Sequence, residues 1–275
     1  MRLLVIRHAV WAAEDDAQRS AHVQHLLLGS AANRPPLPAA PIPRVIVQFW
    51  HDSADVPSDV SECLNSWGPL IECGFRRVLF DNDTARAFIA RFLGRTHAAA
   101  FDRCRHPAMR CDYFRLCWML LRGGFYVDAD EWYLGASCDE LFVDAALKVQ
   151  PLCYDLSTET MVPAAIFLNE YEPSREWIFY VNNNPLIAPR GHPVIRLALE
   201  RATRLLLRPK PPTDIQSTTG PGNLTASLVR HSADRDDAQQ PDFTFLAEWD
   251  SISVSRWPLS YRDDERNWRR WQPTD

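Results

Sequence analysis

The stretch G-G-F-Y-V-D-A-D, residues 123–130, decides how the rest of the chain is interpreted. The paired glycines end the apolar helical pattern before them, and residues 125–127 favour a short strand. Asp128 and Asp130 then place two carboxylates one residue apart at the end of that strand, where open α/β sheets bind ligands. Residues i and i+2 of a strand share a face, so both carboxylates are expected to address one site. A single divalent cation shared with a diphosphate is the simplest ligand for such a pair.

Residues 107–122, P-A-M-R-C-D-Y-F-R-L-C-W-M-L-L-R, predict a helix before that strand. Pro107 suits a first helical position, and apolar residues recur at helical spacing. Asp112 and Arg115 lie three residues apart, which makes them neighbours on one helix face. Because the helix is otherwise apolar, we expect it to be buried, and the pair then needs polar partners such as the ribose and phosphates of a ligand. An ordinary surface ion pair is the alternative.

The composition indicates a globular chain of ordinary type. Of its 275 residues, 46% are hydrophobic and 24% are charged, which suits one large α/β domain or two small ones. The formal net charge of −5 gives no reason to expect a nucleic-acid or anionic-membrane partner. Seven cysteines without a C-x-x-C pair favour a reducing compartment and no structural zinc site. The sequence shows neither an apolar run long enough for a membrane helix nor a signal-peptide pattern, so the expected location is cytoplasmic.

Strand and helix patterns alternate along the chain. Strands are expected over residues 44–50, 75–80, 125–127, 147–153, 162–168 and 243–248, and helices over 56–70, 84–92, 98–104, 107–122, 194–207 and 223–231. This alternation predicts the α/β class, with a mainly parallel central sheet flanked by helices. Residues 1–41 are charged, Ala-rich and Pro-rich, which predicts an N-terminal extension or linker before one domain spanning residues 42–275.

The helix, the paired glycines and the D-x-D together resemble a known signature. The residues C-D-Y-F-R-L…L-L-R-G-G-F-Y-V-D-A-D are similar in order and spacing to S-D-x-x-R-x…L-x-x-x-G-G-x-Y-x-D-x-D. That pattern belongs to DXD-containing glycosyltransferases, the family-32-like sugar transferases that include capsular-polysaccharide and clostridial-toxin relatives. Further matches are Ile42-Pro43 with Gln48 and Trp50, the N-N and H-P of residues 182–193, and Thr219-Gly220-Pro221. The resemblance implies a GT-A fold, a Rossmann-like domain that binds a nucleotide-sugar at the carboxyl ends of its strands.

The same resemblance implies an activity and roles for particular residues. The chain would be a hexosyltransferase of polysaccharide biosynthesis that moves a sugar from a UDP- or GDP-sugar to a hydroxyl of a glycan, lipid or protein, with retention of configuration. Mn²⁺ or Mg²⁺ is the implied cofactor, held chiefly by Asp130 and also by Asp128, and Arg115 completes the catalytic set. The implied donor-binding residues are Trp50, Asp112, Arg115, Asp128, Asn183, Thr219 and Gly220.

The match weakens toward the C-terminus. Relatives close with an H-x-W…S-W segment, whereas this chain carries Asn267-Trp268 and Trp271 within a charged, aromatic stretch and lacks the histidine. Whether residues 261–271 complete the site is therefore left open.

Several other interpretations also stay open. Trp50 fits a buried core position as well as a stacking platform for the donor base, and the three asparagines at 182–184 suit a tight turn as well as sugar hydroxyls. The alternative functions are a non-catalytic GT-A-fold protein that binds sugar nucleotides, and a D-x-D phosphohydrolase. The start L-L-V-I-R-H-A resembles histidine phosphatases, but Ala9 stands where that family has glycine.

Overall fold

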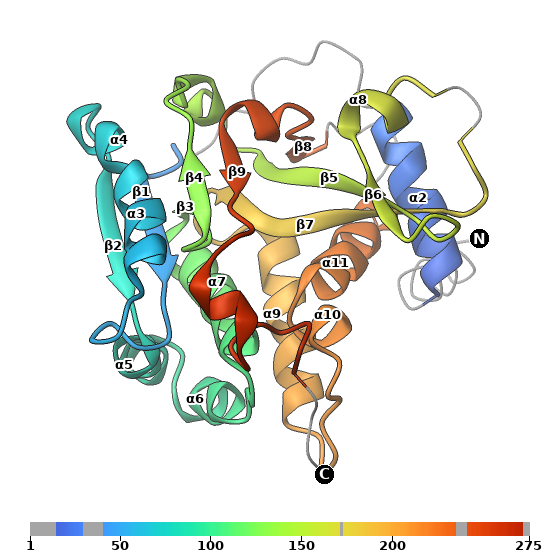
Figure 1. Ribbon diagram of the computed structural model, residues 1–275. Helices are drawn as coiled ribbons and strands as arrows, with labels where there is room; N and C mark the ends of the chain where they lie inside the picture. Colours follow the sequence, from blue (N-terminus) through green and yellow to red (C-terminus); the bar gives the residue numbers. More distant parts are fainter. Residues whose placement is uncertain (1–14, 30–40, 171–172, 235–240, 272–275) are drawn as a thin grey trace.

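The computed structural model describes residues 15–29, 41–170, 173–234 and 241–271, and forms an α/β structure around one large sheet (Figure 1). The strands are β1 Val45–Phe49, β2 Arg76–Phe80, β3 Gly124–Tyr126, β4 Glu131–Tyr133, β5 Leu147–Asp155, β6 Thr160–Val162, β7 Trp177–Ala188, β8 Phe243–Phe245 and β9 Ser253–Ser255. The α-helices are α2 Asp16–Gly29, α3 Ser58–Ser66, α4 Gly68–Glu72, α5 Asn82–Phe92, α6 Arg95–Asp102, α7 Pro107–Arg122, α8 Ala164–Phe167, α9 Pro193–Leu206, α10 Ile215–Thr218 and α11 Pro221–Ala233.

The main sheet has seven strands in the order β2-β1-β3-β7-β5-β6, with β8 added beside β5. β1 runs parallel to β2 and β3, whereas β7 runs antiparallel to both β3 and β5. β8 is parallel to β5 and β6 is antiparallel to it. In the described sheet, β1, β2, β3, β5 and β8 therefore point one way, and β7 and β6 oppose them. The predicted α/β class with a mainly parallel sheet flanked by helices is confirmed.

The two faces of the sheet are packed differently. Helices α7, α9 and α11 cover one face (Figure 1), where Val47 and Tyr126 join the largest apolar cluster. Ile46 and Phe125 point to the opposite face and pack there with Trp67. Neighbouring strand residues face opposite sides of a sheet, which explains this division. The small sheet of β4 and β9 lies beside the main one and brings residues 253–255 next to the turn that follows β3.

Helix α7 has the two ends that the sequence predicts. The His106 side chain caps its start by accepting a hydrogen bond from the Ala108 N–H at 3.0 Å, and Pro107 occupies the first helical position. The helix ends at Gly123, whose φ of 66° is rarely adopted by residues with a side chain. A Cβ at Gly123 would lie 2.6 Å from the main-chain nitrogen of Arg190. Glycine is therefore required where α7 turns directly into β3.

Three local predictions are corrected. The helix expected over residues 56–70 divides at Trp67 into α3 and α4, because Pro69 has no N–H to continue the helical ladder. The strand expected over residues 162–168 is wrong beyond Val162, because Pro163 has no N–H for the ladder and lies at the N-cap of the short helix α8. The turn interpretation of residues 182–184 is also wrong, since these asparagines lie inside β7.

Part of the segment expected as a linker is folded. Residues 16–29 form α2, which packs against β7 and α11 (Figure 1). Val23 is fully buried in an apolar cluster with Phe179 and Val229, and the Phe179 N–H donates to Ser20 Oγ at 2.9 Å. The linker prediction is therefore wrong for α2, because a few apolar contacts with distant strands outweigh a polar local composition. Residues 1–14 and 30–40, with the R-H motif and most of the Pro-rich run, lie outside the described residues.

Candidate functional site

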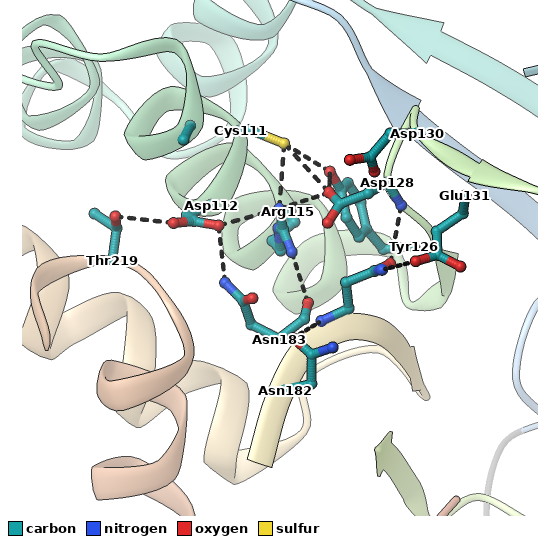
Figure 2. Close-up of polar contacts among 12 residues, drawn as sticks. Cys111, Asp112, Arg115, Tyr126, Asp128, Asp130, Glu131, Asn182, Asn183 and Thr219 are labelled. Carbon is teal, nitrogen blue, oxygen red and sulfur yellow. Dashed lines mark hydrogen bonds and ion pairs between the residues drawn. The ribbon is translucent and has the colours of Figure 1, made fainter. Parts of the chain in front are cut away.

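Arg115 joins several of the expected site residues into one network (Figure 2). Its guanidinium lies 2.8 Å from Asp128 Oδ1 and 3.0 Å from Asp112 Oδ1, and it donates to the main-chain oxygen of Asn183 at 2.7 Å. The guanidinium carbon also lies 4.3 Å from the centre of the Tyr126 ring. Arg115 is only 3% exposed, so these groups rather than water neutralise its charge. The surface-pair interpretation of Asp112 and Arg115 is therefore wrong.

Two further expected residues donate hydrogen bonds to the Asp112 carboxylate. Its carboxylate accepts hydrogen bonds from Asn183 Nδ2 at 2.8 Å and from Thr219 Oγ1 at 3.2 Å (Figure 2). Gly220 lies directly before α11, where a Cβ would come 3.4 Å from Asp112 Oδ2. Burial raises the pKa of the Asp112 carboxyl to about 6, although the nearby Arg115 charge acts in the opposite direction. Thr219 thus contacts Asp112, Gly220 lies close to it, and neither residue is part of the lining of the cavity described below.

Asp128 and Asp130 do not lie on the strand, which corrects the argument from strand spacing. β3 ends at Tyr126, and both aspartates belong to the turn that follows it. Asp128 is fixed there by its own contacts: Tyr126 donates its hydroxyl to Oδ1 at 2.9 Å, and the Asp128 N–H donates to Asn184 Oδ1 at 2.9 Å. The two carboxylates therefore have different partners, although both line the same cavity.

Asp130 is held by residues that the sequence did not single out. The Tyr261 hydroxyl donates to Asp130 Oδ2 at 2.8 Å, and Arg262 forms an ion pair with the same oxygen. Arg262 in turn lies over the Trp257 ring, 4.0 Å from its centre. Burial and the nearby charge of Asp128 raise the pKa of the Asp130 carboxyl. The closing segment, residues 261–271, thus contacts the second aspartate of the D-x-D directly.

Glu131 is a further buried acid that was missed. Its carboxylate accepts a hydrogen bond from Asn184 Nδ2 at 3.0 Å and one from the hydroxyl of Ser253. Burial raises the pKa of Glu131 to about 8, and the charge of Asp130 acts in the same direction. Its position directly after the D-x-D was the available signal, but nothing local indicates that β9 covers it.

These groups line one cavity of about 400 Å³. The predicted site residues among its lining are Trp50, Asp112, Arg115, Asp128, Asp130 and Asn183. Trp257 and residues of the closing segment, 261–271, also line it: Tyr261, Arg262, Arg266, Trp268 and Arg269. Trp50 is 7% exposed and donates its ring N–H to the main-chain oxygen of Asp55 at 3.0 Å. It is therefore both a packed residue and part of the cavity lining.

The two carboxylates suit a divalent cation that takes few ligands from the protein. Side-chain hydrogen bonds and ion pairs from the other described residues engage Oδ1 of Asp128 and Oδ2 of Asp130. Within the same part of the chain, the second oxygen of each carboxylate has no such side-chain partner. Mg²⁺ and Mn²⁺ commonly bind one or two carboxylates and complete their shell with water and substrate phosphate. No group of three or more His, Cys, Asp or Glu side chains forms a metal-binding cluster in the described ranges.

Two further properties follow from the described part of the chain. All seven cysteines are free, and Cys111 lies in the site with its sulfur 2.7 Å from the Tyr126 hydroxyl (Figure 2). None of the described helices combines the length and apolar character needed to span a membrane.

Comparison with protein-family models gives no match, and no curated protein matches the chain. Among solved structures, the PaToxG glycosyltransferase is similar to this chain, with a TM-score of 0.49 and 15% sequence identity over 78% of each chain. Similarity of this degree establishes neither a family nor an activity for this chain.

Proposed function

We propose that this chain is a cation-dependent glycosyltransferase with a GT-A fold, which transfers a sugar from a UDP- or GDP-sugar to a hydroxyl acceptor with retention of configuration. One observation carries the proposal. Asp128 and Asp130 each have one carboxylate oxygen without a side-chain partner among the described residues, and both line a cavity to which three arginines, Arg262, Arg266 and Arg269, also contribute. A diphosphate bound through a divalent cation needs both features, because its oxygens are negative and the cation needs hard oxygen ligands.

The main demand of the reaction is to stabilise the charge that develops on the leaving diphosphate. Mn²⁺ or Mg²⁺, when held by Asp130 and Asp128, would supply Lewis-acid stabilisation of those phosphate oxygens. Arg115 holds Asp128 at 2.8 Å and so fixes the direction of its carboxylate. The arginines of the closing segment place further positive charge at the same cavity, where it can stabilise the negative charge of the leaving diphosphate.

The remaining expected residues divide into those that face the cavity and those that support it. Trp50 lines the cavity and offers part of an aromatic ring for the donor base, and Asn183 offers an amide near the expected position of ribose or sugar. Thr219 acts through Asp112, which it contacts at 3.2 Å, and is therefore a positioning residue.

One observation favours a second candidate, a GT-A-fold protein that binds sugar nucleotides without turning them over. Arg262 already neutralises Asp130, the residue expected to hold the cation. A site in which this ion pair persists would bind a nucleotide without the Lewis acid that transfer needs. Binding without turnover is therefore the outcome that separates the two candidates.

The deciding experiment measures binding and turnover on the same protein. UDP- and GDP-sugars are titrated with Mn²⁺ and with EDTA, and release of free sugar is followed. We expect a higher melting temperature and sugar release only with the cation, because a ligand that binds only the folded protein stabilises it. Equal nucleotide affinity in EDTA and Mn²⁺ would contradict cation dependence, and binding without sugar release would favour the second candidate. Hydrolysis of the diphosphate to a nucleoside monophosphate and a sugar phosphate, without free sugar, would indicate a phosphohydrolase.

Asp130→Asn tests the assignment of the metal ligand. The amide keeps the shape of the side chain but removes the charge that would hold a cation, so turnover should fall by orders of magnitude. Asp139→Asn is the matched control, because Asp139 is exposed and pairs with Arg44 at 2.6 Å on the surface. An Asp130→Asn protein that turns over like the Asp139→Asn protein would remove Asp130 from the site.

A further inference from the structure

Asp130 already has a positively charged partner in the protein. Arg262 forms an ion pair with Asp130 Oδ2, and the Tyr261 hydroxyl donates to the same oxygen at 2.8 Å. The side chains of Arg262 and Asp130 are only 10% and 16% exposed. Because the pair lies largely out of solvent, its interaction is screened much less than that of a surface ion pair.

A divalent cation at Asp130 would compete with this guanidinium. Arg262 uses Oδ2 of the carboxylate, Oδ1 has no side-chain partner among the described residues, and Asp130 lines the cavity. A guanidinium and a divalent cation on one carboxylate repel each other, and burial strengthens that repulsion. Cation binding therefore weakens the Arg262–Asp130 pair, and the pair weakens cation binding.

A diphosphate bound in the cavity would give the Arg262 guanidinium a second partner. The Nε of Arg262 is buried and makes no hydrogen bond to the described residues, and Arg266 and Arg269 line the same cavity. The guanidinium rests over Trp257, at the end of a side chain that can rotate while the 3-10 helix Ser260–Asp263 stays in place. A diphosphate in this cavity offers several oxygens to the planar donors of an arginine.

We infer that Arg262 is an internal counter-ion of Asp130, and that it moves to the diphosphate of the donor when a divalent cation binds. The inference rests on the proposed function and assigns a role to a residue outside the D-x-D. It makes cation and nucleotide binding cooperative: the cation releases Arg262 to the diphosphate, and the diphosphate keeps Arg262 away from Asp130.

Replacing Arg262 should change the two affinities in opposite directions. In Arg262→Met, Mn²⁺ measured alone by electron paramagnetic resonance should bind about tenfold more tightly, a typical size for coupling between two ligands. UDP and GDP, measured by calorimetry at saturating Mn²⁺, should each bind about tenfold more weakly than to the unmodified protein. A general loss of structure would weaken both affinities, so the opposite signs identify the exchange.

Arg256→Met is the matched control. The Arg256 N–H donates to the main-chain oxygen of Asp130 at 3.0 Å, but its guanidinium lies over Trp132 and 3.3 Å from Glu62. This variant should leave both affinities unchanged. Arg262→Gln is neutral but can still donate to Asp130, and it should show the same two shifts if the methionine variant folds poorly.

The outcomes separate this inference from the proposed function. Mn²⁺ affinity that is unchanged or weaker in both Arg262 variants would overturn the inference, even if the protein turns over sugar nucleotides. The two opposite shifts without any sugar release would support the inference and contradict a transferase. Failure of every form to bind Mn²⁺ would overturn both.

Discussion

Arg115 on α7 lies 2.8 Å from Asp128 in the turn after β3, and this contact ties the helix to the turn that carries the D-x-D (Figure 2). The same guanidinium also contacts Asp112 at 3.0 Å. The single buried guanidinium of Arg115 therefore pairs with two carboxylates. Removing it leaves the buried Asp112 carboxylate and the partly buried Asp128 carboxylate without this positively charged partner, whereas removing one carboxylate leaves Arg115 with the other.

We therefore expect Arg115→Met to lower the free energy of unfolding by about 3–5 kcal/mol, the cost of leaving buried charge unpaired. Sugar release should fall with it even per folded molecule, because Asp128 loses the group that fixes its direction. Arg86→Met is the control: Arg86 pairs with Asp102 at 2.7 Å on the surface, where such a pair contributes about 1 kcal/mol or less. Urea unfolding of both variants checks this, and equal losses would show that the Arg115 network contributes no more than a surface pair.

Two glycines with positive φ provide a second test, because only one of them lies against other atoms. At Gly123, with φ 66°, an added Cβ would meet main-chain atoms of Ala188, Pro189 and Arg190 at 2.6–2.8 Å. At Gly135, with φ 89°, nothing lies within 4 Å. Gly135→Ala should cost only the backbone strain, about 1–2 kcal/mol. Gly123→Ala should cost clearly more, about 3 kcal/mol or above, because backbone must also move. Similar urea midpoints for the two variants would contradict the close approach at Gly123.

Features that depend on residues close together in the sequence are the ones that the sequence predicts best. The bounds of α7 and the pairing of Asp112 with Arg115 follow from a proline, a glycine and a separation of three residues, and the structure has both. The partners of Asp130 could not be predicted in this way. Tyr261 and Arg262 lie 131 and 132 residues further along the chain, and pairing of β9 with β4 brings the closing segment beside the turn.

The helix α2 was missed for a related reason. Its own composition is polar, and its burial depends on Phe179 and Val229, which lie far away in the sequence. Local patterns cannot report such contacts, because the apolar face of α2 is only a few residues wide. The position of Asn183 was left open for the same reason. It lies where the register between β5 and β7 shifts, between Val181, which pairs with Pro151, and Leu186, which pairs with Val149.

The packing of α2 gives a third prediction. Val23 is fully buried, whereas Leu28 on the same helix is 62% exposed. Val23→Ala should lower the free energy of unfolding by about 1–3 kcal/mol, because it leaves a cavity against β7. Leu28→Ala removes more atoms but should change stability by about 0.5 kcal/mol or less. Thermal unfolding of the two variants compares them, and a larger loss for Leu28→Ala would show that α2 does not pack as described.

Glu131 predicts how stability depends on pH. Burial raises its pKa from the ordinary 4.5 to about 8, so between these values the folded protein keeps a proton that the unfolded chain has released. Raising the pH through this window therefore favours unfolding, by up to about 1.4 kcal/mol per pH unit. Asp130, whose pKa is also raised, acts in the same direction, so the contribution of Glu131 has to be measured as a difference between two proteins.

Glu131→Gln supplies that difference. The glutamine oxygen can accept from Asn184 and its amide can donate to Ser253, whose hydroxyl lies 3.1 Å from the Trp132 oxygen and can donate there. We expect the variant and the unmodified protein to melt at similar temperatures near pH 5 in EDTA, and the variant to melt several degrees higher near pH 8, because only the unmodified protein must then ionise a buried carboxyl. Glu140→Gln, on the surface, should show no such divergence. A melting-temperature difference between the Glu131→Gln and unmodified proteins that stays constant from pH 5 to pH 8 would mean that Glu131 keeps one charge state throughout, and that Asn184 and Ser253 stabilise its carboxylate despite burial.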